Sequence, residues 1–283
     1  TKLINDGKRL FGAPMKYVVA ILCLIQSSWL FAQEYTFGVV PQYEPQKLNA
    51  IWQPLLDQVS EQTGVTIKLI TVESIPVFEQ AFANGEYDFA YMNPWHSVIA
   101  NEKQGYLPLI KDAGRQLQGV LVVNKNSGID DVSQLEGAEI AFPAPNALGA
   151  SLLMRADLAQ LYGLTIKPVY VQTHSSVYLN VALNSTKAGG GVLGTLKQQP
   201  QNLQDKLKII YKTRKISRHP IVAHPRVDPA IQQKVQQAIL DIGQSEEHKH
   251  LLAGIPIIKP SIATLAEYQQ LTQWGLRSFY VEN

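Results

Sequence analysis

The sequence predicts an α/β fold in which two doubly wound lobes are joined by two crossings of the chain. Strand and helix signals alternate twice, first in residues 35–91 and again in residues 120–211. Two segments, near residues 118–125 and 216–223, are placed where the chain would pass between these units. With 283 residues, 46% of them hydrophobic and 17% charged, the chain is long enough for one large or two medium cores.

The first unit has the order βαβαβ. Apolar residues of its first helix share one face at helical spacing, and Gly64 ends that helix. Ser74 caps its second helix, which stops at Asn84–Gly85. The expected elements are the strand 35–40, the helix 44–63, the strand 65–71, the helix 74–83 and the strand 87–91. This order predicts a mainly parallel sheet covered by helices on both faces.

The second unit repeats the alternation and then returns to the first. Strands are expected at residues 120–123, 139–142, 169–171, 190–192 and 207–211, and helices at 129–135, 148–162 and 177–183. Residues 220–223 are expected to cross back, before the amphipathic helix 228–244 rejoins the first lobe. The predicted domains are therefore lobe 1, residues 34–119 plus 222–283, and lobe 2, residues 120–221. Two crossings imply hinge closure around a ligand.

Residues 15–32 read as a secretory signal peptide. A positive start at Lys16 precedes a short apolar run and the small residue Ala32. An N-terminal membrane anchor is the alternative, although the run is short for the roughly 30 Å of a bilayer core. Residues 1–14 precede Met15 and are excluded from the predicted fold. The single cysteine, Cys23, lies in the signal, so the exported chain is predicted to have no thiol chemistry and to be periplasmic.

Charge and motifs exclude several classes of function. The chain carries +2 and residues 1–32 contribute +3 of that, so the remainder carries −1 and has no basic excess suited to nucleic acid. The pairs His219/His224 and His248/His250 match no compact metal motif, and no metal or cofactor is expected. A nucleophile elbow and a phosphate-binding Gly-Lys-Ser loop are absent from the sequence, so an enzyme is not expected. A secreted hydrolase on an α/β scaffold stays open as an alternative.

Polar or small residues follow four expected strands, at the sheet edge where α/β proteins bind ligands. Asn146, Ala147, Leu148 and Gly149 lead from a strand into a helix, whose first-turn amides and dipole favour an anion. The plainer interpretation is an N-cap formed by Asn146.

The other three strand ends add side-chain donors. His174, Ser175 and Ser176 offer a ring nitrogen, hydroxyls and free amides, unless Ser175 is only a helix cap and His174 lies on the surface. Tyr91 and Asn93 can donate inward before Pro94, although a buried aromatic and a turn Asn are the plainer interpretation. The segment Gln42–Tyr43 follows the first strand and carries the weakest signal.

Five segments together carry a family resemblance: residues 37–42, FGVVPQ; residues 88–94, DFAYMNP; residues 122–129, VVNKNSGI; Pro145–Asn146; and His174. The chain resembles the periplasmic phosphonate-binding proteins of ABC importers, within the two-lobed solute-binding proteins (periplasmic binding protein-like fold, type II). The resemblance implies that residues 146–149 and His174 hold a small oxyanion, with Tyr43 and Tyr91 or Asn93 closing from the other lobe. It also implies delivery to an ABC permease in the inner membrane. A monomer is expected, and a membrane sensor kinase is the alternative partner.

The chain departs from this family at the anion-binding loop. Members that bind aminoalkylphosphonates have Ser-Thr-Ser where this chain has Ala147, Leu148 and Gly149, so backbone amides must do more of the binding. Those members also supply carboxylates to the ligand ammonium, whereas Ser175 follows His174 here. A buried ammonium without a partner is costly. The expected ligand is therefore phosphite, phosphate or methylphosphonate, and an aminoalkyl ligand is expected to be rejected.

Overall fold

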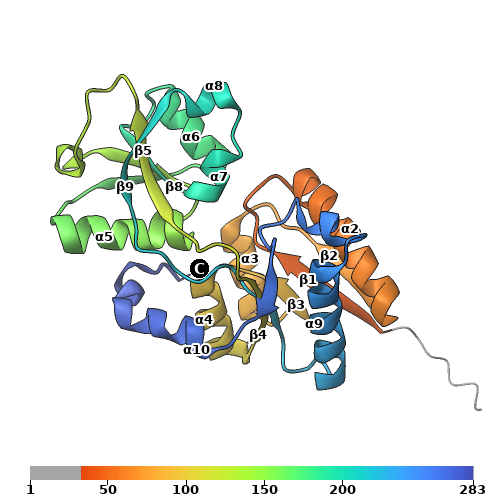
Figure 1. Cartoon of the computed structure of the whole chain (residues 1–283). Coiled ribbons are helices and arrows are strands. Elements are labelled where there is room, and N and C mark those ends of the chain that lie inside the picture. Colours follow the sequence, from red (N-terminus) through yellow and green to blue (C-terminus); the bar gives the residue numbers. More distant parts are fainter. Residues whose placement is uncertain (1–32, 283) are drawn as a thin grey trace, which may run out of the picture. The chain divides into compact units, whose positions relative to one another are not determined.

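Two β-sheets organise residues 33–282, the part of the chain that the computed structural model describes (Figure 1). In spatial order the first sheet contains β11 (Pro260–Ile262), β4 (Leu107–Asp112), β10 (Ile221–Ala223), β3 (Phe89–Tyr91), β1 (Glu34–Val39) and β2 (Thr66–Ile70). The second contains β7 (Lys167–Tyr170), β6 (Glu139–Phe142), β8 (Ala188–Val192), β5 (Gly119–Asn124) and β9 (Leu207–Lys212). The predicted α/β class with two lobes is confirmed. The predicted signal peptide, residues 15–32, lies outside the described residues.

We call the first sheet with its helices the first lobe. Those helices are α2 (Pro45–Thr63), α3 (Ile75–Ala83), α4 (Pro94–Gln104) and α9 (Pro229–Gln244). Gly64 ends α2 in the left-handed conformation, at φ 68°, and the Ser74 hydroxyl caps α3, as the sequence predicts. Aromatic rings join sheet to helix: the centroids of Trp52 and Tyr91 are 4.8 Å apart, and those of Trp52 and Phe37 are 5.5 Å apart. This packing fixes the end of β3, where the site begins.

The second sheet with its helices forms the second lobe. Its helical segments are η1 (Val132–Leu135), η2 (Leu148–Leu152), α5 (Leu153–Tyr162), α6 (His174–Ala182), α7 (Leu193–Lys197) and α8 (Gln201–Gln204). Apolar residues of β5, β6 and β8 pack against these helices in two buried clusters. The predicted helix 148–162 is present, but it opens with a π-helical turn, η2. Helix α6 begins three residues before the predicted 177–183 because Thr173 caps it, accepting from the Ser176 amide at 3.1 Å.

The parallel order predicted for the βαβαβ unit is confirmed, whereas both complete sheets are mixed. β1 runs parallel to β2 and β3, and β6 runs parallel to β7 and β8. β10 and β5 are antiparallel to the strands on either side. Each of these two strands enters its sheet from a crossing rather than from a helix packed on that sheet. The rule that makes βαβ neighbours parallel therefore does not apply to them.

Two segments connect the lobes and run side by side in Figure 1. Residues 113–118 lead out of β4 into β5, and residues 213–220 lead from β9 back to β10. The amides and carbonyls of Leu117 and Ile216 form a reciprocal pair at 2.9 and 3.0 Å. Residues 120–123 and 220–223, which the sequence assigned to the crossings, lie mostly inside the sheets, so each crossing is earlier than expected. The domain boundaries predicted at residues 119/120 and 221/222 remain predictions.

The last elements, which sequence analysis left unassigned, form a segment that contacts both lobes. They are β11, α10 (Ala266–Gln269) and the 3₁₀ turns η3 (Lys249–Leu252), η4 (Gln270–Trp274) and η5 (Leu276–Phe279). α10 packs on α4 of the first lobe, and η5 packs on α5 of the second. Arg155 of α5 donates to the carbonyl of Phe279 at 2.7 Å, and Asn146 exchanges hydrogen bonds with the backbone of Val281. Among the described residues, no helix is long and apolar enough to span a membrane.

Candidate anion-binding site

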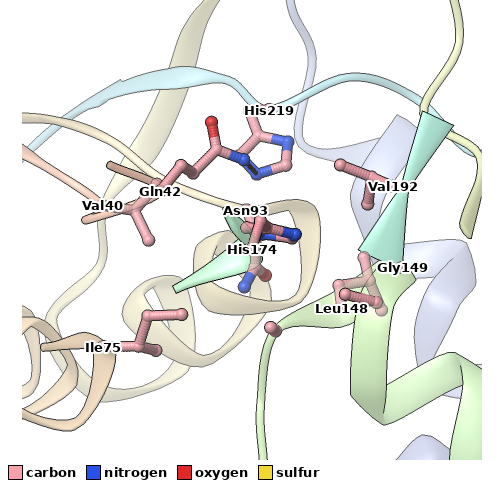
Figure 2. Close-up of a pocket in the computed structure, with 11 residues that line it drawn as sticks. Val40, Gln42, Ile75, Asn93, Leu148, Gly149, His174, Val192 and His219 are labelled. Atoms are coloured by element: carbon pink, nitrogen blue, oxygen red, sulfur yellow. Dashed lines mark hydrogen bonds between the residues drawn. The ribbon is translucent and has the colours of Figure 1, made fainter. Parts of the chain in front are cut away.

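A small cavity lies between the two lobes and is lined from both (Figure 2). Its volume is about 20 Å³, slightly more than the roughly 10–15 Å³ that a single water requires. It therefore suits one compact group rather than an extended molecule. The lining residues are Val40, Gln42, Ile75 and Asn93 from the first lobe, Ala147, Leu148, Gly149, Ala150, His174 and Val192 from the second, and His219 from the return crossing.

The η2 turn supplies backbone donors on the second-lobe side. In this turn, the amides of Ser151 and Leu152 are the first that donate a hydrogen bond. Both donate to the carbonyl of Ala147. Within residues 33–282, the amides of Leu148, Gly149 and Ala150 donate to no acceptor. Free first-turn amides and the helix dipole together make a helix N-terminus favourable for an anion. The predicted donor loop is thus on the cavity wall, without side-chain hydroxyls.

Two glycines allow η2 to lie this close to the second sheet. A Cβ atom at Gly119 would come within 2.0 Å of the carbonyl oxygen of Gly149, and one at Gly190 within 2.1 Å of that of Ala150. No side chain tolerates such contacts, so both positions require glycine. The run Gly189–Gly191 lies in the buried strand β8, which accommodates η2.

His174 brings a titratable side chain to the cavity. It is the first residue of α6 and is 3% exposed, so the alternative of a surface His174 is wrong. Its Nδ1 atom is buried and has no hydrogen-bond partner among the described residues. Burial lowers the pKa of His174 to about 4, because desolvation disfavours the charged ring. At neutral pH the ring is neutral and has one N–H to donate.

Asn93 and Asn146 join the lobes beside the cavity. Asn93 caps α4, accepting from the His96 amide at 2.8 Å, and its side-chain amide donates to the carbonyl of Asn146 at 3.1 Å. The side chain of Asn146 is occupied elsewhere: it donates to Glu79 at 3.1 Å and to the Val281 carbonyl at 2.7 Å. Asn146 therefore neither caps the helix nor lines the cavity, although its backbone positions Asn93.

Gln42 and His219 form another wall of the cavity, as Figure 2 shows. Their side-chain Nε2 atoms are 3.3 Å apart, and His219 stacks on Tyr91 with ring centroids 5.3 Å apart. Burial, reinforced by the charge of Arg218, lowers the pKa of His219 well below its ordinary value. The imidazole is therefore neutral, and its Nε2 can accept the amide proton of Gln42.

The remaining predicted residues lie farther out. Tyr43 and Tyr91 line a second cavity of about 130 Å³, which shares Gln42, Val192 and His219 with the first. The Tyr43 hydroxyl donates to Gln198 of the second lobe, and burial raises its pKa to about 12. Ser175 and Ser176 line neither cavity, and the Ser176 hydroxyl is hydrogen-bonded to Thr173 at 2.9 Å.

Sequence analysis missed His219 and gave Gln42 little weight. His219 was compared only with His224, as a metal pair, and no group of residues able to hold a metal occurs in the described part of the chain. Its position on a predicted crossing was an available signal, because a crossing borders the space between the lobes.

Comparison with known proteins identifies the family of this chain. A family model described as "ABC transporter, phosphonate, periplasmic substrate-binding protein" matches residues 37–268. The Phosphate-import protein PhnD of Mycolicibacterium smegmatis (strain ATCC 700084 / mc(2)155) is 21% identical over 228 residues, covering 73% of this chain and 71% of the relative.

Solved structures share the fold. A binding protein component of an ABC phosphonate transporter from Pseudomonas aeruginosa aligns with a TM-score of 0.79 at 18% identity, covering 86% of this chain and 85% of the other. PhnD1 from Prochlorococcus marinus (MIT 9301), solved with methylphosphonate, aligns with a TM-score of 0.79 at 16% identity, covering 88% of this chain and 100% of the other. With its family model spanning both sheets, the chain belongs to the periplasmic substrate-binding proteins of phosphonate ABC transporters.

Proposed function

We propose that the cavity between the lobes binds the oxyanion head of a phosphonate, phosphite or phosphate, and that the protein delivers this ligand to a permease in the inner membrane. One observation carries the proposal. The unpaired amides of Leu148, Gly149 and Ala150 belong to residues lining the same small cavity as the buried His174, whose Nδ1 has no partner among the described residues. Buried polar groups are normally satisfied, so donors collected around one cavity point to a ligand.

The hydrogen-bond donors of this cavity are uncharged, and such donors suit an anionic ligand. None of the eleven lining residues has a formal charge at neutral pH, since the pKa values of His174 and His219 are lowered. Amide and imidazole N–H groups can bind an oxyanion without a counter-ion, and such bonds strengthen where water is excluded. Closure of the lobes over the ligand would provide this exclusion.

The lining also selects among phosphorus compounds. No carboxylate lines the first or the second cavity, so a ligand ammonium has no partner there. We expect 2-aminoethylphosphonate to bind more weakly than methylphosphonate, phosphite or phosphate. The names of two relatives, one a phosphate-import protein and the other solved with methylphosphonate, support ligands of this size.

The remaining parts of the proposal concern the protein's setting. Residues 15–32 would direct export and be removed, leaving a periplasmic monomer. It would bind its ligand without turnover and without a cofactor or metal.

A thermal-shift panel on the purified protein tests the function. The panel contains phosphite, phosphate, methylphosphonate, 2-aminoethylphosphonate, sulfate and taurine. A ligand at a hundred times its Kd stabilises the folded state by about 2.7 kcal/mol, which a melting curve resolves. We expect a phosphorus oxyanion to give the largest shift. A shift with sulfate or taurine and none with phosphorus compounds would refute the ligand class.

A further inference from the structure

We propose that the preferred ligand is a phosphonate whose substituent ends in a second anionic group, such as a carboxylate, held by a basic chamber beside the head site. This inference rests on the proposed function and specifies its ligand class. The basic chamber is defined here by the four cationic side chains around two connected cavities: Arg115, Lys197, Lys215 and Arg218.

The three cavities are neighbours, because consecutive ones share lining residues. The head site of about 20 Å³ shares Gln42, Val192 and His219 with the cavity of about 130 Å³. That cavity shares Arg115, Leu117, Gly194, Lys197 and Arg218 with a third, of about 460 Å³. The head site admits only a compact group, so a substituent on phosphorus has to extend past Gln42 and His219, toward the cations.

The charged residues that line the two larger cavities are all cationic. Neither larger cavity has a carboxylate among its lining residues. Arg115, Lys197 and Lys215 make no ion pair within residues 33–282. The chain without residues 1–32 has a formal charge of −1, so this group of cations is a local feature and not part of a basic surface.

Arg218 is the most buried of the four. Its side chain is 11% exposed and forms a long ion pair with the buried Asp112, Nε to Oδ2 at 3.9 Å, which is too far for a hydrogen bond. Both atoms are buried without a hydrogen-bond partner in the described chain. The Nη1 atom of Arg218 lies 4.0 Å from the position that a Cβ atom on Gly194 would occupy. The side chain therefore extends from the return crossing toward α7. A planar guanidinium with free donors matches a carboxylate in geometry as well as charge.

The cations come from the two paired crossings and from the second lobe. Arg115 lies on the first crossing, Lys215 and Arg218 on the return crossing, and Lys197 on α7 of the second lobe. An anionic substituent between them would relieve the repulsion among these like charges when the lobes close. The second anion would then favour the closed state in addition to adding contacts.

Titration calorimetry at about 0.15 M ionic strength tests the inference. The probes are methylphosphonate, phosphonoacetate and the amide of phosphonoacetate, which has nearly the same shape without the second charge. We expect phosphonoacetate to bind at least about tenfold more tightly than its amide. The double variant Arg115→Gln/Lys197→Gln should remove most of this ratio and change methylphosphonate affinity less than about threefold.

The matched control is Lys68→Gln/Lys234→Gln, which makes the same change in net charge at two exposed residues of the first lobe. It should preserve the ratio. Equal affinity for phosphonoacetate and its amide would overturn the inference. An equal loss of affinity for all three probes in the double variant would also overturn it, because such a loss indicates only nonspecific electrostatic attraction. In either case methylphosphonate binding would leave the proposed function intact. If none of the probes binds and the thermal-shift panel shows no phosphorus ligand, the proposed function fails as well.

Discussion

The side-chain amide of Asn93, in the first lobe, donates to the backbone carbonyl of Asn146, in the second, at 3.1 Å in a buried position. The same side chain caps α4 through its oxygen. One residue therefore fixes a helix start within its own lobe and a contact across the cavity.

Substitution of Asn93 separates these two roles. Asn93→Ser retains a capping oxygen but loses the amide donor, so stability should change little while ligand binding weakens about fivefold, the equivalent of one hydrogen bond of about 1 kcal/mol. Asn93→Ala loses the cap as well and should also lower the free energy of unfolding by about 1 kcal/mol. Urea unfolding and calorimetry measure the two effects. Unchanged affinity in both variants would show that the contact does not support closure.

Gly149→Glu should abolish oxyanion binding. The new side chain would enter a cavity of about 20 Å³ and bring a negative charge to the amides that an anion needs. Ala230→Glu, at an exposed position of α9, adds the same charge and should bind normally. Calorimetry measures binding, and circular dichroism checks folding. Normal affinity in a folded Gly149→Glu protein would rule out this position for the site.

Gly190→Ala should disturb the protein far more than Gly194→Ala. The added methyl group at residue 190 would lie 2.1 Å from the carbonyl oxygen of Ala150, whereas at residue 194 the nearest atom is 4.0 Å away. Overpacking of this kind costs roughly 1–3 kcal/mol and would displace the first turn of η2. Thermal unfolding and ligand affinity should both fall for Gly190→Ala alone. Similar stability in the two variants would show that η2 is not held against β8 as described.

The free protein should lose stability below pH 6.5 in a way that depends on His174. Its pKa is about 4 in the folded state, against about 6.5 in an unfolded chain. Between these values the unfolded state binds the extra proton, so stability falls as the pH decreases, by about 2 kcal/mol for this residue at pH 5. His174→Gln should show a loss smaller by that amount. Urea midpoints at pH 7.5 and 5 give the comparison, and equal losses in both proteins would contradict a buried, neutral His174.

The architecture could be predicted because it depends on local signals. Gly64 ended α2 and Ser74 began α3 as expected, since caps and terminating glycines act within a few residues. The strand pairing in the mixed sheets was not predictable in the same way. β5 and β10 take their direction from the crossings, which is a property of the tertiary path.

Several residues that line the cavity were named from the sequence. Residues 147–149 and His174 line the cavity because they follow strands that end at the same sheet edge. The side-chain partners of Asn146 were not predictable, because Glu79 and Val281 are distant in sequence. His219 and the basic chamber were missed for the same reason, since only the folded crossings bring them beside the strand ends.

The C-terminal segment adds a non-covalent tie to the two covalent crossings. It rests on α4 through α10 and is held to the second lobe by Asn146 and Arg155. Opening of the lobes must therefore release this segment from one side before the cavity is uncovered. The time a ligand stays bound would then depend on how often the last residues detach, and not only on contacts with the ligand. Affinity and residence time would thus vary independently where the contacts of this segment differ.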